Sequence, residues 1–198
     1  MSERSSRETL QKFCKWVIKL YAKEYLRQPT FNDIQKLYAH HASTHGFPWM
    51  LGSIDCTHWS WSNCPVAWRG QYMRGDHDNP TLMLQAVASQ DLWFWHAFFG
   101  VADSNNDINV LHHSTLFNDV LTGKAPVFLF VANNVTYKYG YYLADEIYPE
   151  WATFVKTFQY PQGDKRQKFA KVQESARKDI ERAFSVLKAR WQILQNLP

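Results

Sequence analysis

The chain is poor in cysteine, in low-complexity sequence and in long apolar runs. Its three cysteines (Cys14, Cys56 and Cys64) are too few and too scattered for a disulfide framework, and no C-x-x-C pair gives a zinc signature. No run is long enough for a transmembrane helix, and the polar start MSERSSRETL lacks the apolar core of a secretory signal. We therefore expect a reduced, intracellular protein with no membrane association.

What the chain does contain is enough apolar sequence for a packed core. Of its 198 residues 45% are hydrophobic and 16% aromatic, including nine tryptophans. This composition is typical of a globular chain and excludes a disordered one. The length fits one domain with small extensions.

The net charge of +4 is unevenly distributed. Residues 1–46 carry eight basic and four acidic side chains, residues 47–162 five and ten, and residues 163–198 nine and four. Basic ends suit a polyanion such as nucleic acid, and a carboxylate-rich centre suits metal binding. The alternative is that the basic ends are solvated helices whose lysines only confer solubility, and charge alone favours that explanation.

The N-terminal region, residues 1–46, is predicted to be a helical extension. Apolar residues recur on one helical face over roughly 8–27. Thr30 and Asp33 resemble a capping box for a second helix, which Gly46 ends. Because neither helix shows an obvious groove-reading face, we expect a packing appendage and not a DNA-reading module.

From residue 47 onwards the pattern changes to alternating strands and helices. Strands are predicted at 50–59, 81–89, 92–100, 127–132 and 135–145. Helices are predicted at 107–122, from Pro149 and at about 164–194. Near-continuous apolar strands indicate a sheet that is covered on both faces. This order is that of an RNase-H-like domain, so we predict an α/β fold for 47–198, with a mixed sheet flanked by helices.

Three acids stand at positions that such a topology brings together. Asp55 lies inside the strand-like phrase GSIDCTHWSW, Asp145 ends the apolar run GYYLAD, and Glu181 lies on the last helix, with 35 residues between the last two. Carboxylates are hard oxygen ligands and suit Mg²⁺. Two such ions about 3.5–4 Å apart can activate water and stabilise the leaving oxygen of a phosphodiester. The acids therefore predict a metal-dependent nuclease site.

Each acid also has a structural explanation. A buried aspartate such as Asp55 can bond backbone amides, although this is less common. Asp145 precedes a turn, where aspartate is an ordinary turn former. Arg177 lies one helical turn before Glu181, and a surface ion pair between them would explain Glu181 fully. The functional interpretation depends on the three acids acting together.

Asp107 and His58 are weaker candidates for the same site. Asp107 is a possible accessory carboxylate, but it is better explained as a helix N-cap. We expect His58 to lie on the same strand face as Asp55, where it contacts substrate or fills the wall of the site.

A basic segment, 66–77, is a candidate DNA contact. It carries Arg69, Gln71 and Arg74, with a tryptophan and a tyrosine interleaved. Phosphate contact combined with aromatic stacking is a common mode of nucleic-acid binding. An ordinary solvated loop explains the same residues equally well.

Several long phrases together resemble one known family. They are GSIDCTHWSWSNCPVAWRGQY, PTLMLQAVASQDLWFWHAFFG, SNNDINVLHHSTLFNDVL, YYLADEIYPEWATFVKTF and QESARKDIERAFSVLKARW. In order and without gaps over roughly 25–195, they resemble the PIF/Harbinger superfamily of DDE transposases, of the plant type, which includes domesticated nuclease-like derivatives.

The resemblance implies a DDE catalytic triad, which maps to Asp55, Asp145 and Glu181 with the D-35-E spacing common in such enzymes. It further implies Mg²⁺ or Mn²⁺, as two ions, hydrolysis of DNA phosphodiester bonds in the nucleus, and cooperation with a separate Myb-like DNA-binding protein. The alternative is a catalytically inactive, domesticated or degenerate derivative that acts as a DNA- or protein-binding nuclear protein.

Two departures from the family pattern bear on activity. Glu146 stands where the family usually has glycine after the second aspartate, which predicts a misplaced Asp145 or binding of a wrong ion. Restoring glycine should then raise cleavage. The sequence also ends at Pro198, before the last helical segment of the family, so the resemblance implies a domain that is truncated at its C-terminus.

Overall fold

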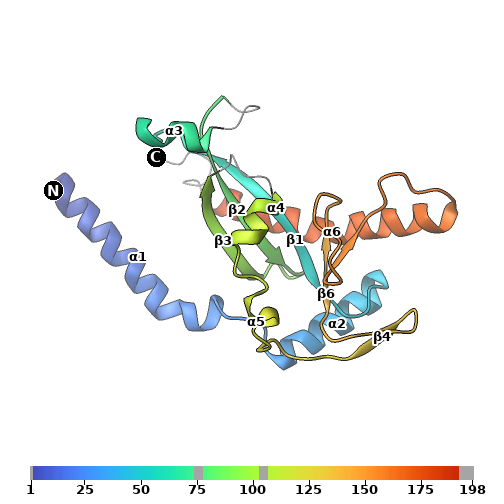
Figure 1. The fold of residues 1–198 in the computed structure, drawn as a ribbon. Coiled ribbons are helices and arrows are strands. Elements are labelled where there is room, and N and C mark those ends of the chain that lie inside the picture. Colours follow the sequence, from blue (N-terminus) through green and yellow to red (C-terminus); the bar gives the residue numbers. More distant parts are fainter. Residues whose placement is uncertain (1, 74–77, 103–106, 192–198) are drawn as a thin grey trace.

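The computed structural model describes residues 2–73, 78–102 and 107–191. In chain order the elements are α1 (Glu3–Tyr25), α2 (Phe31–His45), β1 (Met50–Ser60), α3 (Val66–Tyr72), β2 (Thr81–Ala88), β3 (Phe94–Ala102), α4 (Asp107–His113), α5 (Asn118–Leu121), β4 (Phe130–Ala132), β5 (Val135–Tyr137), β6 (Tyr141–Ala144), β7 (Phe154–Lys156) and α6 (Asp164–Arg190) (Figure 1). No helix among these is long and apolar enough to cross a membrane.

A five-stranded mixed sheet forms the centre of the fold, in the order β3-β2-β1-β6-β7. The pairs β1–β2 and β2–β3 are antiparallel, whereas β1–β6 and β6–β7 are parallel. Helices flank the sheet, as the sequence predicts, and the arrangement is consistent with an RNase-H-like domain (Figure 1). β1 therefore lies in the middle and carries Asp55 into the interior.

The two faces of the sheet bury different clusters. The cluster beneath α6 consists of Trp59, Leu84, Ala86, Ala88, Ile180, Ala183 and Phe184. The cluster on the other side consists of Ile54, Val87, Leu111, Ala144, Tyr148 and Phe154. Side chains alternate along a strand, so Trp59 faces α6 and Ile54 faces α4. This alternation decides which neighbours of Asp55 share its face.

The two N-terminal helices behave differently. α2 begins with the predicted capping box of Thr30 and Asp33 and ends at Gly46, which adopts the left-handed conformation. It buries Ile34 and Leu37 in the core. α1 buries none of its residues and extends away from the sheet (Figure 1). Only α2 therefore packs as the appendage that the sequence predicts.

The single helix predicted over 107–122 is two short helices, α4 and α5. Ser114 lies at the break. Its hydroxyl lies 2.8 Å from Nε2 of His96 and accepts a hydrogen bond from the backbone N–H of Leu116. Serine side chains that bond nearby backbone groups compete with continuation of a helix.

Other predicted boundaries also shift. The strand predicted over 135–145 is divided at Gly140, where an added Cβ would lie 2.7 Å from the carbonyl oxygen of Trp49. The helix expected after Pro149 is wrong: β7 forms there and pairs with β6 in parallel. The segment 66–77 is not simply a loop, because α3 occupies its first part.

Candidate functional site

Asp55 lies half-buried on β1, the central strand. Its Oδ1 accepts a hydrogen bond of 2.9 Å from the backbone N–H of Cys56. The pKa of Asp55 is raised to about 6, mainly by burial and to a smaller extent by the charges of Asp107 and Asp145, against the opposing effects of the Cys56 backbone N–H and of Arg177. A carboxyl held in this state gains from any additional cation beside it.

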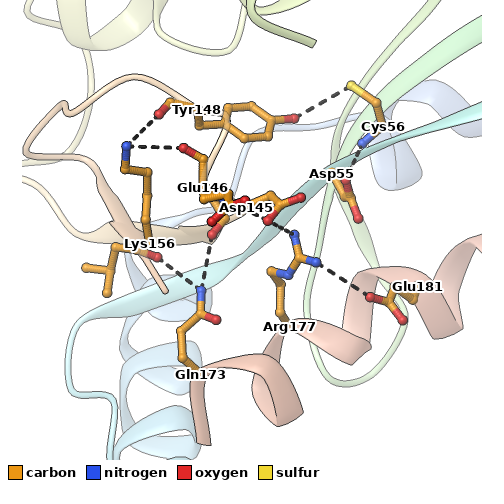
Figure 2. Close-up of polar contacts among 11 residues, drawn as sticks. Asp55, Cys56, Asp145, Glu146, Tyr148, Lys156, Gln173, Arg177 and Glu181 are labelled. Carbon is orange, nitrogen blue, oxygen red and sulfur yellow. Dashed lines mark hydrogen bonds and ion pairs between the residues drawn. The ribbon is translucent and has the colours of Figure 1, made fainter. Parts of the chain in front are cut away.

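Asp145 follows β6, the parallel neighbour of β1. In this parallel pair Ser53 lies opposite Leu143, so Asp145, two residues after Leu143, lies level with Asp55. The turn after Asp145 is held from two sides (Figure 2). The buried amide of Gln173 donates to the carbonyl oxygen of Ala144 at 3.1 Å, and the ammonium of Lys156 donates to that of Tyr148 at 2.9 Å. The position of Asp145 is thus set by α6 and β7.

Arg177 of α6 joins the second and third acids. Its guanidinium lies 3.6 Å from Oδ1 of Asp145 and 3.8 Å from Oε1 of Glu181, as Figure 2 shows. The Arg177 side chain is only 16% exposed, whereas those of Asp145 and Glu181 are 39% and 52% exposed. The ion pair expected between Arg177 and Glu181 is present, and the same arginine also holds Asp145.

Asp107 is the first residue of α4, as expected for a residue near the start of a helix. It also lies near enough to Asp55 to influence its ionisation. Its charge raises the pKa of Asp55 and that of the Cys56 thiol, for which burial is the larger cause. The thiol of Cys56 lies 3.6 Å from the hydroxyl of the buried Tyr148. Asp107 therefore contributes negative charge to the site from the side of α4.

The predicted DNA contacts lie elsewhere. Arg69 and Gln71 are exposed on α3, and Arg74 lies outside the described residues. The expectation for His58 is wrong: it lies three positions after Asp55 in a continuous strand register, so the two side chains face opposite sides of the sheet. The structure thus groups the acids, whereas Arg69 and Gln71 lie on α3 and His58 lies on the opposite face of β1.

Two positioning residues escaped the sequence analysis. Gln173 is 1% exposed and ties α6 to β6 and β7. Its signal was a polar residue at a core-facing position of the last helix, four residues after Phe169. Lys156 gave no signal, because the strand that carries it was predicted as a helix.

The residues present fit divalent cations. Asp55, Asp145 and Glu181 offer only carboxylate oxygens, which Mg²⁺ and Mn²⁺ prefer. Among the described residues they are not a group whose ligand atoms all lie within 4.8 Å of one another. Arg177 pairs with both Asp145 and Glu181.

A family model described as plant transposon protein matches residues 23–197. That range covers most of the chain and both the sheet and α6. The chain therefore belongs to this family of plant transposon proteins. No curated protein and no solved structure matches it.

Proposed function

We propose that the chain is a transposase-like endonuclease domain of the PIF/Harbinger type, which hydrolyses DNA phosphodiester bonds through Asp55, Asp145 and Glu181. The observation that supports this most is the electrostatic imbalance around Asp55. Burial and two neighbouring carboxylates raise its pKa to about 6, and Arg177 is the cation that opposes them. Clustered acids of this kind recruit cations or protonate.

In this mechanism Asp55, Asp145 and Glu181 would hold Mg²⁺ or Mn²⁺. Bound there as two ions, the metal would activate the attacking water and stabilise the leaving oxygen. Asp55 presents a full negative charge only above the pH at which its carboxyl ionises, so activity should fall in acid. Arg177 keeps Asp145 and Glu181 oriented towards each other until the substrate and ions arrive. Gln173 and Lys156 fix the turn on which Asp145 stands.

DNA is the proposed substrate, with phosphate contacts from Arg69, Gln71 and Arg74. Nuclear action and cooperation with a Myb-like DNA-binding protein are part of the same proposal. The support for a polyanionic substrate is the excess of basic residues at both ends of the chain. The family of plant transposon proteins to which the chain belongs agrees with a DNA substrate.

The test is nicking of supercoiled plasmid DNA by the purified chain with Mg²⁺ or Mn²⁺. We expect Asp55→Asn and Glu181→Gln each to lower the rate at least about 100-fold, since each removes a metal ligand. Glu174→Gln is the matched control, because it neutralises an exposed glutamate on the same helix. Equal nicking by all four proteins would assign the activity to a contaminant and overturn the proposal.

One observation favours the alternative, a non-catalytic DNA- or protein-binding derivative. Arg177 already neutralises part of the charge on Asp145 and Glu181. If this ion pair is permanent, divalent ions gain little by entering. Calorimetry with Mn²⁺ in the absence of DNA separates the two functions: the nuclease binds the ion and the Asp55→Asn variant does not, whereas the inactive derivative binds it in neither form.

A further inference from the structure

A second set of metal-binding side chains lies between α2 and α6, apart from the three acids. His41 and His45 come from α2 and Asp179 from α6, and one candidate ligand atom from each lies within 4.8 Å of the other two. The histidines are four residues apart, so one helical turn brings both rings to the same face. Their ring centroids are 6.1 Å apart.

Three polar atoms of this cluster are buried and lack hydrogen-bond partners among the described residues. His41 is 0% exposed and Asp179 is 6% exposed. Within the described part of the chain, three buried atoms have no hydrogen-bond partner: the two ring nitrogens of His41 and Oδ2 of Asp179. The other oxygen of Asp179, Oδ1, accepts a bond of 3.0 Å from Arg182. Buried polar atoms are nearly always satisfied, so three such atoms side by side point to a ligand.

We propose that His41, His45 and Asp179 bind one Zn²⁺ ion. Two imidazoles and one carboxylate are a donor set that zinc accepts, with a water molecule as fourth ligand. Tetrahedral zinc with bonds of about 2.0–2.2 Å separates its ligand atoms by about 3.3 Å. The three donors would therefore move together by little more than about 1 Å, which small side-chain rotations can supply.

Charged side chains lie beside the cluster. Asp179 and Asp91 supply the negative charge nearby, and Arg182 is the cation beside them.

The ion would join the N-terminal helix α2 to the closing helix α6. Asp179 is two residues before Glu181, and Arg177 is two residues before Asp179. Zinc bound here would fix the segment of α6 that carries Arg177 and Glu181, the two residues that α6 contributes to the candidate acid site. Zinc binding does not depend on the proposed nuclease activity, because it uses none of the three acids.

The test titrates Zn²⁺, and Co²⁺ as its coloured substitute, into the metal-stripped full chain. We expect one ion per chain, the visible spectrum of four-coordinate cobalt and a rise in Tm on adding Zn²⁺. His45→Gln should weaken binding at least about tenfold and abolish the rise in Tm. His40→Gln, on the same helix but outside the cluster, should retain both. A double variant with Asp55→Asn and Glu181→Gln should also bind zinc normally.

Three results would overturn the zinc site. One is an octahedral cobalt spectrum or no binding in the unmodified chain. Another is zinc binding that His45→Gln leaves unchanged. The third is zinc binding that disappears only in the double variant, which would place the ion at the three acids. Because His45 is only half-buried, its replacement by glutamine leaves the core intact.

Discussion

Asp179 and Glu181 are two residues apart on α6, yet they lie in opposite surroundings. The Asp179 side chain is 9% exposed and faces the histidines of α2. The Glu181 side chain is 52% exposed and shares Arg177 with Asp145. Ile180, which is 0% exposed, separates them and packs beneath the sheet.

The comparison shows how one helix can serve two kinds of cation site. A dry site with imidazole ligands suits an ion that stays and holds two helices together. A wetter site of carboxylates suits Mg²⁺, which keeps several of its waters and can meet a substrate. The periodicity of α6 allows both proposed sites, because neighbouring positions face different layers of the fold.

Truncation of Ile180 should destabilise α6, which carries residues of both candidate cation sites, and should give the largest change in stability. Ile180→Ala removes a fully buried side chain, so we expect a loss of about 2–5 kcal/mol in the free energy of unfolding, measured by urea denaturation. Val186→Ala is the control, because Val186 is 39% exposed on the same helix; it should change stability by about 0.5 kcal/mol or less. Equal losses in both variants would mean that α6 is not anchored through Ile180.

How far the sequence predicts the fold depends on the range of the contacts. β1 and α6 were predicted because each carries a long, regular apolar pattern, and the capping box of Thr30 and Asp33 is a local signal. The α1 helix was predicted from the same kind of pattern, but nothing in that pattern reveals that the helix has no buried residue.

The candidate sites divide in the same way. The positions of Asp55, Asp145 and Glu181 follow from strand order and from the resemblance to transposases. The double role of Arg177 did not follow, because its contact with Asp145 joins distant segments. The pair His41 and His45 is visible on α2, but its partner Asp179 comes from the far end of the chain and carries no local signal.

The carboxylate site of Asp55, Asp145 and Glu181 should make the stability of the chain depend on pH. In the folded chain the pKa of Asp55 is about 6, raised from 3.8. The folded state therefore binds this proton more tightly than the unfolded state, and stability falls as pH rises from about 4 to 6. In metal-free protein, Asp55→Asn should be more stable than the unmodified chain at pH 7, by about 1–2 kcal/mol after allowance for partial solvent contact.

Thermal unfolding in the presence of a chelator measures this difference, and the advantage should disappear below pH 4, where the carboxyl is neutral in both states. A gain that is equal at pH 4 and pH 7 would show that packing, and not ionisation, explains the effect of Asp55→Asn.

The smallest effect is expected at Glu146, although the family pattern suggested a serious defect there. Glu146 is exposed, and its backbone N–H donates to Oδ1 of Asp145 at 2.8 Å. It is not among the non-glycine residues with positive φ in the described structure, so this turn does not require glycine. Glu146→Gly should therefore change the nicking rate by no more than about twofold, since it removes only one screened charge.

Glu146→Gln isolates that charge without loosening the turn. If glycine raises the rate far more than glutamine does, backbone freedom next to Asp145 limits catalysis, and the turn held by Lys156 is too rigid for the reaction.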